Sequence, residues 1–162
     1  VYVATPDAVK PNAAVKTVTV STTAEMYRAV LEETENADIV IKAAAPADYA
    51  PEAVAENKIK SGELTLKLKK NPDIAAAVGK IKGERKLVIF SAETENLKEN
   101  ATEKLKKKGA DMVVANNVLT PGAGFSTDTN IAAIITEKSF VQLDKMTKRE
   151  LADVILDEII KL

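Results

Sequence analysis

Short apolar runs alternate with longer amphipathic runs along the whole chain. Runs typical of β-strands are expected at residues 1–5, 16–21, 37–44, 63–69, 86–92, 111–115, 131–136 and 139–143. Helical patterns are expected at residues 22–35, 71–82, 95–108 and from residue 147 to the last residue. This alternation predicts an α/β domain with a mostly parallel sheet that is covered by helices on both faces. In such sheets, ligands bind beyond the carboxyl ends of the strands.

Local signals refine these expected elements. The runs at 37–44 and 86–92 read as buried strands, whereas Leu64, Leu66 and Leu68 alternate with polar residues and predict a strand with one wet face. The helix near residue 71 is expected to take Asn71 as its cap and Pro72 as its first residue. Residues 131–143 predict a hairpin, and the last helix is expected to bury Leu162 with the rest of its apolar stripe.

The composition predicts one globular domain over residues 1–162. The chain is 46% hydrophobic and 29% charged with a net charge of −1, so the basic excess of a nucleic-acid binder is missing. No apolar run approaches the roughly 20 residues of a membrane span, and no signal peptide is visible. The default expectation is a cytoplasmic protein without nucleic-acid or membrane partners.

The chain contains neither cysteine nor histidine. It therefore cannot supply a Cys–His or Ser–His–Asp constellation or a zinc site of the usual ligands. Any metal must be bound by oxygen ligands, which suits Mg²⁺ that is carried in by phosphates. Because only Arg28, Arg85 and Arg149 are arginines, anion binding falls mainly to lysines and backbone N–H groups.

An unusually long connection follows the apolar run at 37–44. Residues 43–63 read AAAPADYAPEAVAENKIKSGE, whereas a plain connection in an α/β domain needs roughly two to six residues. Lys58 and Lys60 would lie on one side of an extended segment, where an anion could bind between them. They also fit simple solvated loop lysines. Asp48 is the neighbouring carboxylate that could hold Mg²⁺ beside a phosphate chain.

Three other segments could carry chemistry. Asp73 lies at a helix start, which suits a neutral polar group better than a phosphate. Lys104 and Lys108 lie one turn apart on a helix and also fit a solvated face. Residues 122–128 predict a loop with a possible apolar lid around Phe125. Neither a G-x-G-x-x-G after a strand nor a P-loop is present.

Six motifs occur in a fixed order along the chain. They are residues 43–49 (AAAPADY), 58–60 (KIK), 70–74 (KNPDI), 90–94 (FSAET), 115–117 (ANN) and 124–130 (GFSTDTN). Together they resemble the bacterial phosphopantothenoylcysteine synthetase family, the ligase half of the bifunctional coenzyme A biosynthesis protein. The resemblance spans nearly the whole chain. It implies a Rossmann-like three-layer domain with a small β-hairpin or dimerisation element, from which the first βα unit is missing.

The resemblance also implies a reaction. The family uses CTP and Mg²⁺ to join phosphopantothenate to L-cysteine in coenzyme A biosynthesis. The substrate carboxylate attacks the α-phosphate of CTP to form an acyl-cytidylate and release pyrophosphate, and the cysteine amine then displaces CMP. This chemistry needs positioning and charge neutralisation rather than a protein nucleophile. FMN belongs to the decarboxylase half of the bifunctional protein, which lies outside this sequence.

The resemblance assigns roles by position. Lys58 matches the family's essential triphosphate lysine, supported by Lys60, and Asp48 matches a nucleotide-binding aspartate and a candidate metal ligand. The CTP contacts that it implies are Ala43, Ala44, Asp48, Lys58, Pro72, Asp73, Ile74, Ala75, Phe90, Lys104 and Lys108. For the last two lysines, the resemblance favours nucleotide binding over a solvated face.

The resemblance also implies a homodimer in which each subunit lends part of the partner's site. The run of Leu64, Leu66 and Leu68 is a candidate interface, although these leucines also fit the subunit's own core. Two departures from the family pattern stand out. Ser61 replaces a lysine found in many relatives, and the chain begins at Val1 without the segment that helps to bind phosphopantothenate. The chain is therefore expected to bind CTP without completing catalysis.

Two other functions fit the same fold class. One is a nucleotide-binding regulatory module without chemistry, which would have no need for the pair of Lys58 and Asp48. The other is a dinucleotide-dependent oxidoreductase, which requires an acidic ribose contact after a glycine-rich turn. A preference for CTP with Mg²⁺ would favour the ligase over both.

Overall fold

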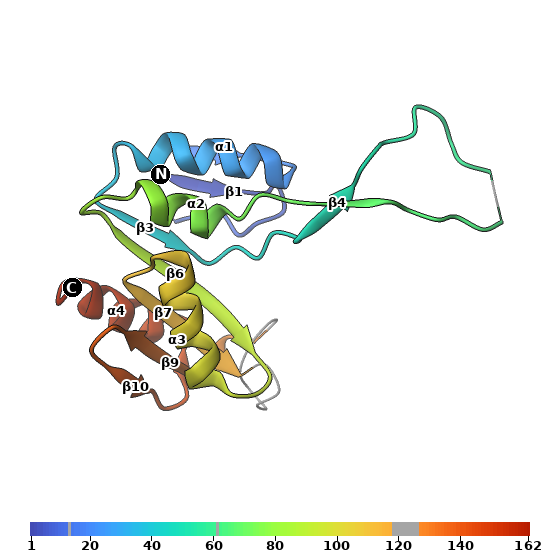
Figure 1. Ribbon diagram of the computed structural model, residues 1–162. Helices are drawn as coiled ribbons and strands as arrows, with labels where there is room; N and C mark the ends of the chain where they lie inside the picture. Colours follow the sequence, from blue (N-terminus) through green and yellow to red (C-terminus); the bar gives the residue numbers. More distant parts are fainter. Residues whose placement is uncertain (13, 61, 118–126) are drawn as a thin grey trace.

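A five-stranded sheet forms the centre of the molecule. The computed structural model describes residues 1–12, 14–60, 62–117 and 127–162 (Figure 1). The sheet has the order β10-β9-β7-β6-β3. Its strands are β3 (Ile39–Lys42), β6 (Lys86–Glu93), β7 (Met112–Asn117), β9 (Ala132–Thr136) and β10 (Phe140–Gln142). Strands β3, β6 and β7 run parallel, and β9 and β10 form the predicted antiparallel hairpin.

Helices cover both faces of this sheet. The first face carries α1 (Thr23–Thr34), α2 (Ile74–Ile81) and α3 (Leu97–Lys108), and the second carries α4 (Lys148–Ile159). Alternation along β6 explains both contacts, because Leu87 and Ile89 pack on the first face and Val88 packs on the second. The predicted three-layer α/β architecture, with its mostly parallel sheet, is therefore confirmed.

Helices α2 and α3 approach each other closely at Gly79. A Cβ atom built on Gly79 would lie 1.8 Å from the carbonyl oxygen of Lys108, so only glycine fits there. Gly109, the residue after Lys108, is the C-terminal cap of α3 and has the left-handed conformation with φ 62. The two glycines bring the backbones of α2 and α3 into contact and fix their relative positions.

Strands β1 (Tyr2–Ala4) and β2 (Thr17–Thr19) form a separate parallel pair. Among the strands that the structure describes, β3 is hydrogen-bonded to β6 alone and not to β1 or β2. The strand predicted at 37–44 is present as β3, but its predicted burial was wrong. As an edge strand, β3 leaves Ile39 and Ile41 42% and 45% exposed. The run at 86–92 is the buried strand that the sequence predicts.

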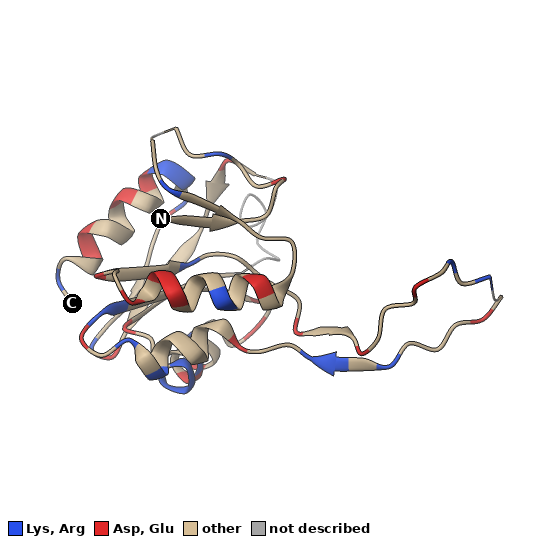
Figure 2. Cartoon of the chain, turned by 90° about the horizontal axis from the view of Figure 1, so that it is seen from above, with Lys and Arg blue, Asp and Glu red and all other residues tan. Residues whose placement is uncertain are grey.

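An extended arm, residues 49–60 and 62–70, projects from the body (Figures 1 and 2). Its base is the antiparallel pair of β4 (Tyr49–Pro51) and β5 (Leu68–Lys70). The predicted strand at 63–69 with one wet face was wrong, because only its end belongs to β5 and because Leu64, Leu66 and Leu68 are all exposed. These leucines therefore do not pack in the core of their own chain.

The ends of two helices differ from the predictions made from the sequence. Asp73, rather than Asn71, caps α2, so Pro72 precedes the helix instead of beginning it. Thr147 caps α4 through a capping box with Glu150. Leu162 is 37% exposed because the helix ends before it, so its predicted burial was wrong. The two strands not yet described, β8 (Thr129–Asn130) and β11 (Met146–Thr147), pair with each other.

Two further observations concern the described residues. The predicted lid around Phe125 lies outside them, so that prediction has no structural counterpart here. Among the helices of the described ranges, each is too short or too polar to reach across a lipid bilayer.

Candidate functional site

A cleft of about 390 Å³ lies where β3 and β6 end and α2 begins. We call it the lysine cleft. The described residues that line it include most of the predicted nucleotide contacts: Asp48, Pro72, Asp73, Ile74, Ala75, Phe90, Lys104 and Lys108. These residues come from sequence segments far apart, and the fold brings them together at the expected edge of the sheet.

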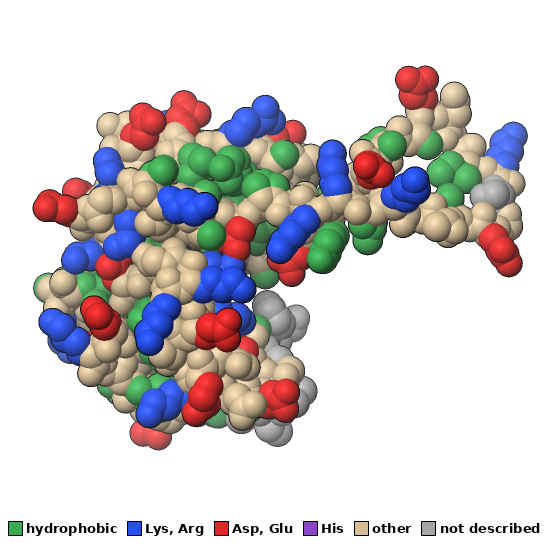
Figure 3. All heavy atoms as spheres, viewed as in Figure 1, with side chains coloured by type: hydrophobic (Ala, Val, Ile, Leu, Met, Phe, Trp, Pro, Cys, Tyr) green, Lys and Arg blue, Asp and Glu red, His purple; other side chains and the backbone are tan. Residues whose placement is uncertain are grey.

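The lysine cleft carries an excess of positive charge. Among its described lining residues, the lysines are Lys42, Lys70, Lys104, Lys107 and Lys108, and the acids are Asp48 and Asp73. Figure 3 shows basic side chains gathered where the arm leaves the body. A concave surface with this charge balance attracts anions.

Lys108 forms an ion pair with Asp73 across the cleft. The other oxygen of Asp73 accepts a hydrogen bond from the backbone nitrogen of Ala76 at 3.0 Å and so caps α2. Burial alone would raise the pKa of Asp73, but the bonds from Lys108 and Ala76 hold this pKa below its ordinary value. Asp73 therefore remains a carboxylate, which supports the expectation that a neutral polar group suits the start of α2 better than a phosphate.

Lys104 is held by a second carboxylate. Its Nζ atom lies 2.7 Å from Oε1 of Glu93 and 2.8 Å from Oγ of Ser91. Ser91 also donates a hydrogen bond to Glu93, and Asn100 donates to the other carboxylate oxygen at 3.2 Å. Burial would raise the pKa of Glu93, but these donors, Lys104 first, lower it below its ordinary value. Glu93 is therefore negatively charged at neutral pH.

Lys42, the last residue of β3, lines the lysine cleft and also a larger cavity beside it. Its ammonium donates a hydrogen bond to the carbonyl of Ala44 at 2.9 Å. Burial lowers the pKa of Lys42; the carboxylate of Asp73 partly offsets this, while nearby Lys108 lowers the pKa further. Lys42 is thus a partly desolvated cation at the boundary of two cavities.

Asn71 anchors the base of the arm beside the cleft. Its backbone nitrogen donates to the carbonyl of Asp48 at 2.8 Å, and its side-chain amide donates to the carbonyl of Ala47 at 2.9 Å. These bonds join the outgoing and returning limbs of the arm. They place Asp48 and Tyr49 next to the start of α2, although Asn71 does not cap that helix.

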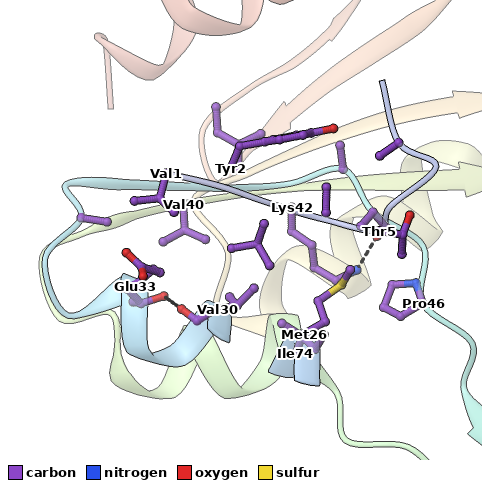
Figure 4. A pocket seen from close by; sticks show the side chains of 18 of the residues that line it. Val1, Tyr2, Thr5, Met26, Val30, Glu33, Val40, Lys42, Pro46 and Ile74 are labelled. Carbon is purple, nitrogen blue, oxygen red and sulfur yellow. Dashed lines mark hydrogen bonds between the residues drawn. The ribbon is translucent and has the colours of Figure 1, made fainter. Parts of the chain in front are cut away.

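Ala43 and Ala44 line the larger cavity instead of the lysine cleft. This cavity measures about 990 Å³ and lies between the strand pair β1–β2 and the edge strand β3. Figure 4 shows side chains of several elements around it, among them Tyr2 from β1, Val30 from α1 and Val40 from β3. The structure therefore places the two predicted alanine contacts in a different cavity from most of the other predicted nucleotide contacts, although Ile74 lines both cavities.

Lys58 and Lys60 lie on the arm, outside the linings of both cavities. Both are exposed, and the arm carries them away from the body (Figure 2). One chain by itself thus brings together Asp48, Asp73, Lys104 and Lys108 but does not bring Lys58 to them. The predicted contact of Lys58 with the triphosphate stays a prediction, and it would require a second subunit.

A metal site built from protein side chains alone is not found in the described ranges. No group of three or more acidic residues lies close enough there to hold a metal ion. Asp48 and Asp73 are the carboxylates that line the cleft. This small donor set fits a Mg²⁺ ion whose other ligands are phosphate oxygens and water.

Sequence reasoning did not name several residues at the cleft as site residues, although Lys70, Ser91 and Glu93 lie within the motifs at 70–74 and 90–94. Lys42, Lys70, Lys107 and Ser91 line it, and Glu93 lies directly behind Lys104. Lys42 directly precedes the AAAPADY motif, and Lys107 lies between the predicted contacts Lys104 and Lys108. Their closeness in sequence to predicted site residues was the signal that could have identified them. The contact of Glu93 with Lys104 joins a strand to a helix, so the spacing of the two residues along the sequence could not predict it.

Comparison with known proteins gives concordant matches. The sequence model of a family described as the DNA/pantothenate metabolism flavoprotein C-terminal domain matches residues 1–162. The Coenzyme A biosynthesis bifunctional protein CoaBC of Bacillus subtilis (strain 168) is 40% identical over 153 residues, which are 93% of this chain and 38% of that protein. A Cysteine/Cysteine sulfinic acid decarboxylase from an unknown prokaryotic organism is 39% identical over 152 residues, 91% of this chain and 42% of that protein.

A solved structure is also similar. It is the C-terminal domain of a Coenzyme A biosynthesis bifunctional protein CoaBC, with a TM-score of 0.81 and 37% sequence identity. The match covers 98% of this chain and 73% of that one. The chain spans less than half the length of the two curated relatives, at 38% and 42%.

Proposed function

The chain belongs to the DNA/pantothenate metabolism flavoprotein C-terminal domain family, and on that premise we propose that it forms the ligase site of a coenzyme A biosynthesis protein. In this proposal the site joins phosphopantothenate to L-cysteine at the expense of CTP. The lysine cleft is the observation that carries the proposal. It combines cationic side chains with a helix start at the carboxyl ends of two parallel strands, and its charge balance suits a nucleoside triphosphate.

The proposed reaction proceeds in two balanced steps. The carboxylate of phosphopantothenate attacks the α-phosphorus of CTP, the bond to the β-phosphate breaks, and pyrophosphate leaves. The amine of cysteine then attacks the acyl carbon, loses a proton, and expels CMP as the amide forms. Both steps build or shift negative charge on phosphate oxygens, so positioned cations lower the barrier without a protein nucleophile.

Specific residues would serve these steps. Lys104 and Lys108 neutralise charge on the phosphate chain, while the start of α2 and Phe90 contact the base or sugar. Mg²⁺ supplies further charge neutralisation when bound with the phosphates, and Asp48 is the side chain that would hold it. Lys42 extends the positive surface toward the neighbouring cavity.

We also propose that Lys58 acts on the cleft of a partner subunit. The arm carries Lys58 away from the cleft of its own chain, and the arm's leucines are exposed. Both features are typical of a segment that docks on another chain. A homodimer would therefore complete each nucleotide site with the partner's arm.

Calorimetric titration tests the nucleotide assignment. We expect the chain to bind CTP in the presence of Mg²⁺ more tightly than ATP or UTP. Lys108→Ala should weaken CTP binding about tenfold or more, because it removes a charge-assisted contact. Lys106→Ala is the matched control, since Lys106 is exposed on the same helix and does not line the cleft.

Two outcomes would contradict the proposal. Equal affinity for all three nucleotides would remove the reason to assign CTP, and the absence of any nucleotide binding would remove the assignment of the cleft. The regulatory-module alternative makes a different prediction for the intact protein that contains this domain. There CTP would bind, but addition of phosphopantothenate and cysteine would release neither pyrophosphate nor CMP.

A further inference from the structure

Glu93 is a buried carboxylate directly behind the lysine cleft. Its side chain is only 8% exposed, and it does not belong to the described lining of the cleft. Both of its oxygens are nevertheless used. Oε1 accepts bonds from Ser91 and Lys104, and Oε2 accepts a bond from Asn100. A buried carboxylate with this set of partners stays charged and fixed in place.

The partners of Glu93 come from two elements. Ser91 and Glu93 lie on β6, whereas Asn100 and Lys104 lie one turn apart on α3. Asn100 also donates to the carbonyl of Glu95 at 3.0 Å, in the turn between the two elements. The carboxylate thus connects the end of the strand to one face of the helix, and Lys104 is the charged member of the network that lines the cleft, beside Ser91.

The two ion pairs at the cleft differ in what opening them would cost. The side chain of Asp73 is 43% exposed and lines the cleft, so water or a ligand can replace Lys108 as its partner. Glu93 is 8% exposed, so moving Lys104 away would leave a buried charge short of a partner. Lys108 can therefore rearrange at low cost, while Lys104 is held in place.

We propose that Glu93 is the positioning residue for Lys104, which it holds at the rim of the cleft, ready for an anionic group of the nucleotide. The inference rests on the proposed function and deepens it, because it assigns to Glu93 a role in phosphate binding that acts through another residue. An ammonium has three N–H donors, and Glu93 and Ser91 engage two of them. One donor remains for a ligand, on a side chain whose freedom is already restricted before binding.

The first test is Glu93→Gln. Glutamine keeps the shape of the side chain and an oxygen acceptor but removes the charge that fixes Lys104. We expect CTP affinity to fall about three- to tenfold, which lies in the lower part of the range of coupling between residues that contact each other. Unchanged or tighter binding would overturn the inference, because it would mean that Glu93 has no influence on the ligand or competes with it for Lys104.

A double-mutant cycle separates positioning from general stability. In the Lys104→Ala background, Glu93→Gln should change CTP affinity no further, since the residue through which it acts is gone. A residue that only stabilises the fold would weaken binding equally in both backgrounds, and that result would also overturn the inference. Asn100→Ala, which leaves Glu93 itself in place, should weaken binding in the same direction but less, and it provides a readout if Glu93→Gln fails to fold.

A matched control pair lies elsewhere in the molecule. Asp111 accepts a bond from Lys82 at 2.8 Å and is 22% exposed, but neither residue lines the lysine cleft. Asp111→Asn should lower the melting temperature without changing nucleotide affinity. A loss of CTP affinity in this control as large as in Glu93→Gln would mean that destabilisation explains both effects, and the inference would fail.

Inorganic triphosphate distinguishes this inference from the proposed function. If the chain binds triphosphate but not CTP, the ligase assignment fails, and a weaker binding of triphosphate by Glu93→Gln would still support the positioning role. If CTP binds but neither probe responds to Glu93→Gln, only the positioning role fails. If neither probe binds the parent chain, both proposals fail.

Discussion

Asp73 shows how one side chain serves both the fold and the site. It caps α2 through the nitrogen of Ala76 and pairs with Lys108 across the lysine cleft. A ligand that recruits Lys108 would leave Asp73 its helix cap, so the helix need not move when the pair opens. The sequence indicated a helix start near this residue but placed the cap two residues too early, because Asn71 and Asp73 are both good capping residues. The competing bonds of Asn71 to the base of the arm decided between them.

Two carboxylates, Asp73 in the lining of the cleft and Glu93 behind it, predict an acid-sensitive fold. The pKa values of Asp73 and Glu93 lie below their ordinary values of 3.8 and 4.5, so the unfolded chain binds these protons more readily than the folded chain. Their contribution to stability is therefore complete above about pH 5 and is lost as the pH falls through the folded-state pKa values. We expect the melting temperature to fall as the pH is lowered below about 5.

Asp73→Asn is the variant that checks this source of acid sensitivity. Asparagine can still cap α2, but it does not titrate. The drop in melting temperature on acidification should therefore be smaller in this variant by roughly 1–3 °C. Solvent screens this partly exposed pair and keeps the effect small. Thermal unfolding at a series of pH values gives the comparison. Parallel curves for the two proteins would show that Asp73 is not one of the groups responsible.

At the scale of elements, the contact between α2 and α3 determines the shape of the cleft. The first turn of α2 forms one wall, and the lysines of α3 form another. Their separation is fixed where Gly79 meets the carbonyl of Lys108. The helix pattern of both segments was predictable from the sequence, but this contact was not, because a glycine inside a helix carries no signal about the backbone that lies against it.

Gly79→Ala tests that contact. The added methyl group would overlap the backbone of α3, which cannot rotate away as a side chain could, so the helices must separate. We expect a loss of roughly 1–3 kcal/mol in the free energy of unfolding. Weaker CTP binding should accompany it, because the cleft lysines would shift with α3. Chemical denaturation measures the first effect and calorimetric titration the second.

Gly62→Ala is the control for this substitution. No atom of the described residues lies within 4 Å of a Cβ atom built at Gly62, so the stability of this variant should stay within about 0.5 kcal/mol of the parent chain. If the two alanine variants were equally stable, the close approach at Gly79 would not be a constraint on the fold.

At the scale of the whole molecule, sequence reasoning succeeded where periodicity is strong. The three-layer architecture, the hairpin of β9 and β10, and the family resemblance are confirmed. It failed where burial depends on a neighbouring strand. The pattern at β3 reads as buried, but the edge position exposes Ile39 and Ile41. Similarly, alternation in the arm predicted a wet and a dry face, but the side chains on both sides of residues 63–69 are exposed.

The arm yields a prediction about assembly. Leu64, Leu66 and Leu68 are 56%, 57% and 56% exposed, which is unfavourable for apolar side chains unless another surface covers them. We expect the protein to dimerise through the arm, and Leu66→Asp to weaken the dimer by roughly tenfold or more, since a carboxylate would enter an apolar contact. Sedimentation velocity over a range of concentrations measures the dissociation constant.

Leu156→Asp is the matched control, because Leu156 is 49% exposed on α4 rather than on the arm. It should leave the association unchanged. Should the parent chain be monomeric at every concentration, or should both variants weaken the dimer alike, the arm would not be the interface.

The contact of Gly79 with Lys108 has a further consequence for how such a site can change over time. A recess whose width is set by main-chain atoms keeps that width while the side chains around its mouth are exchanged. Substitutions at the mouth can therefore tune which molecule is accepted, while the spacing between the two helices is inherited unaltered.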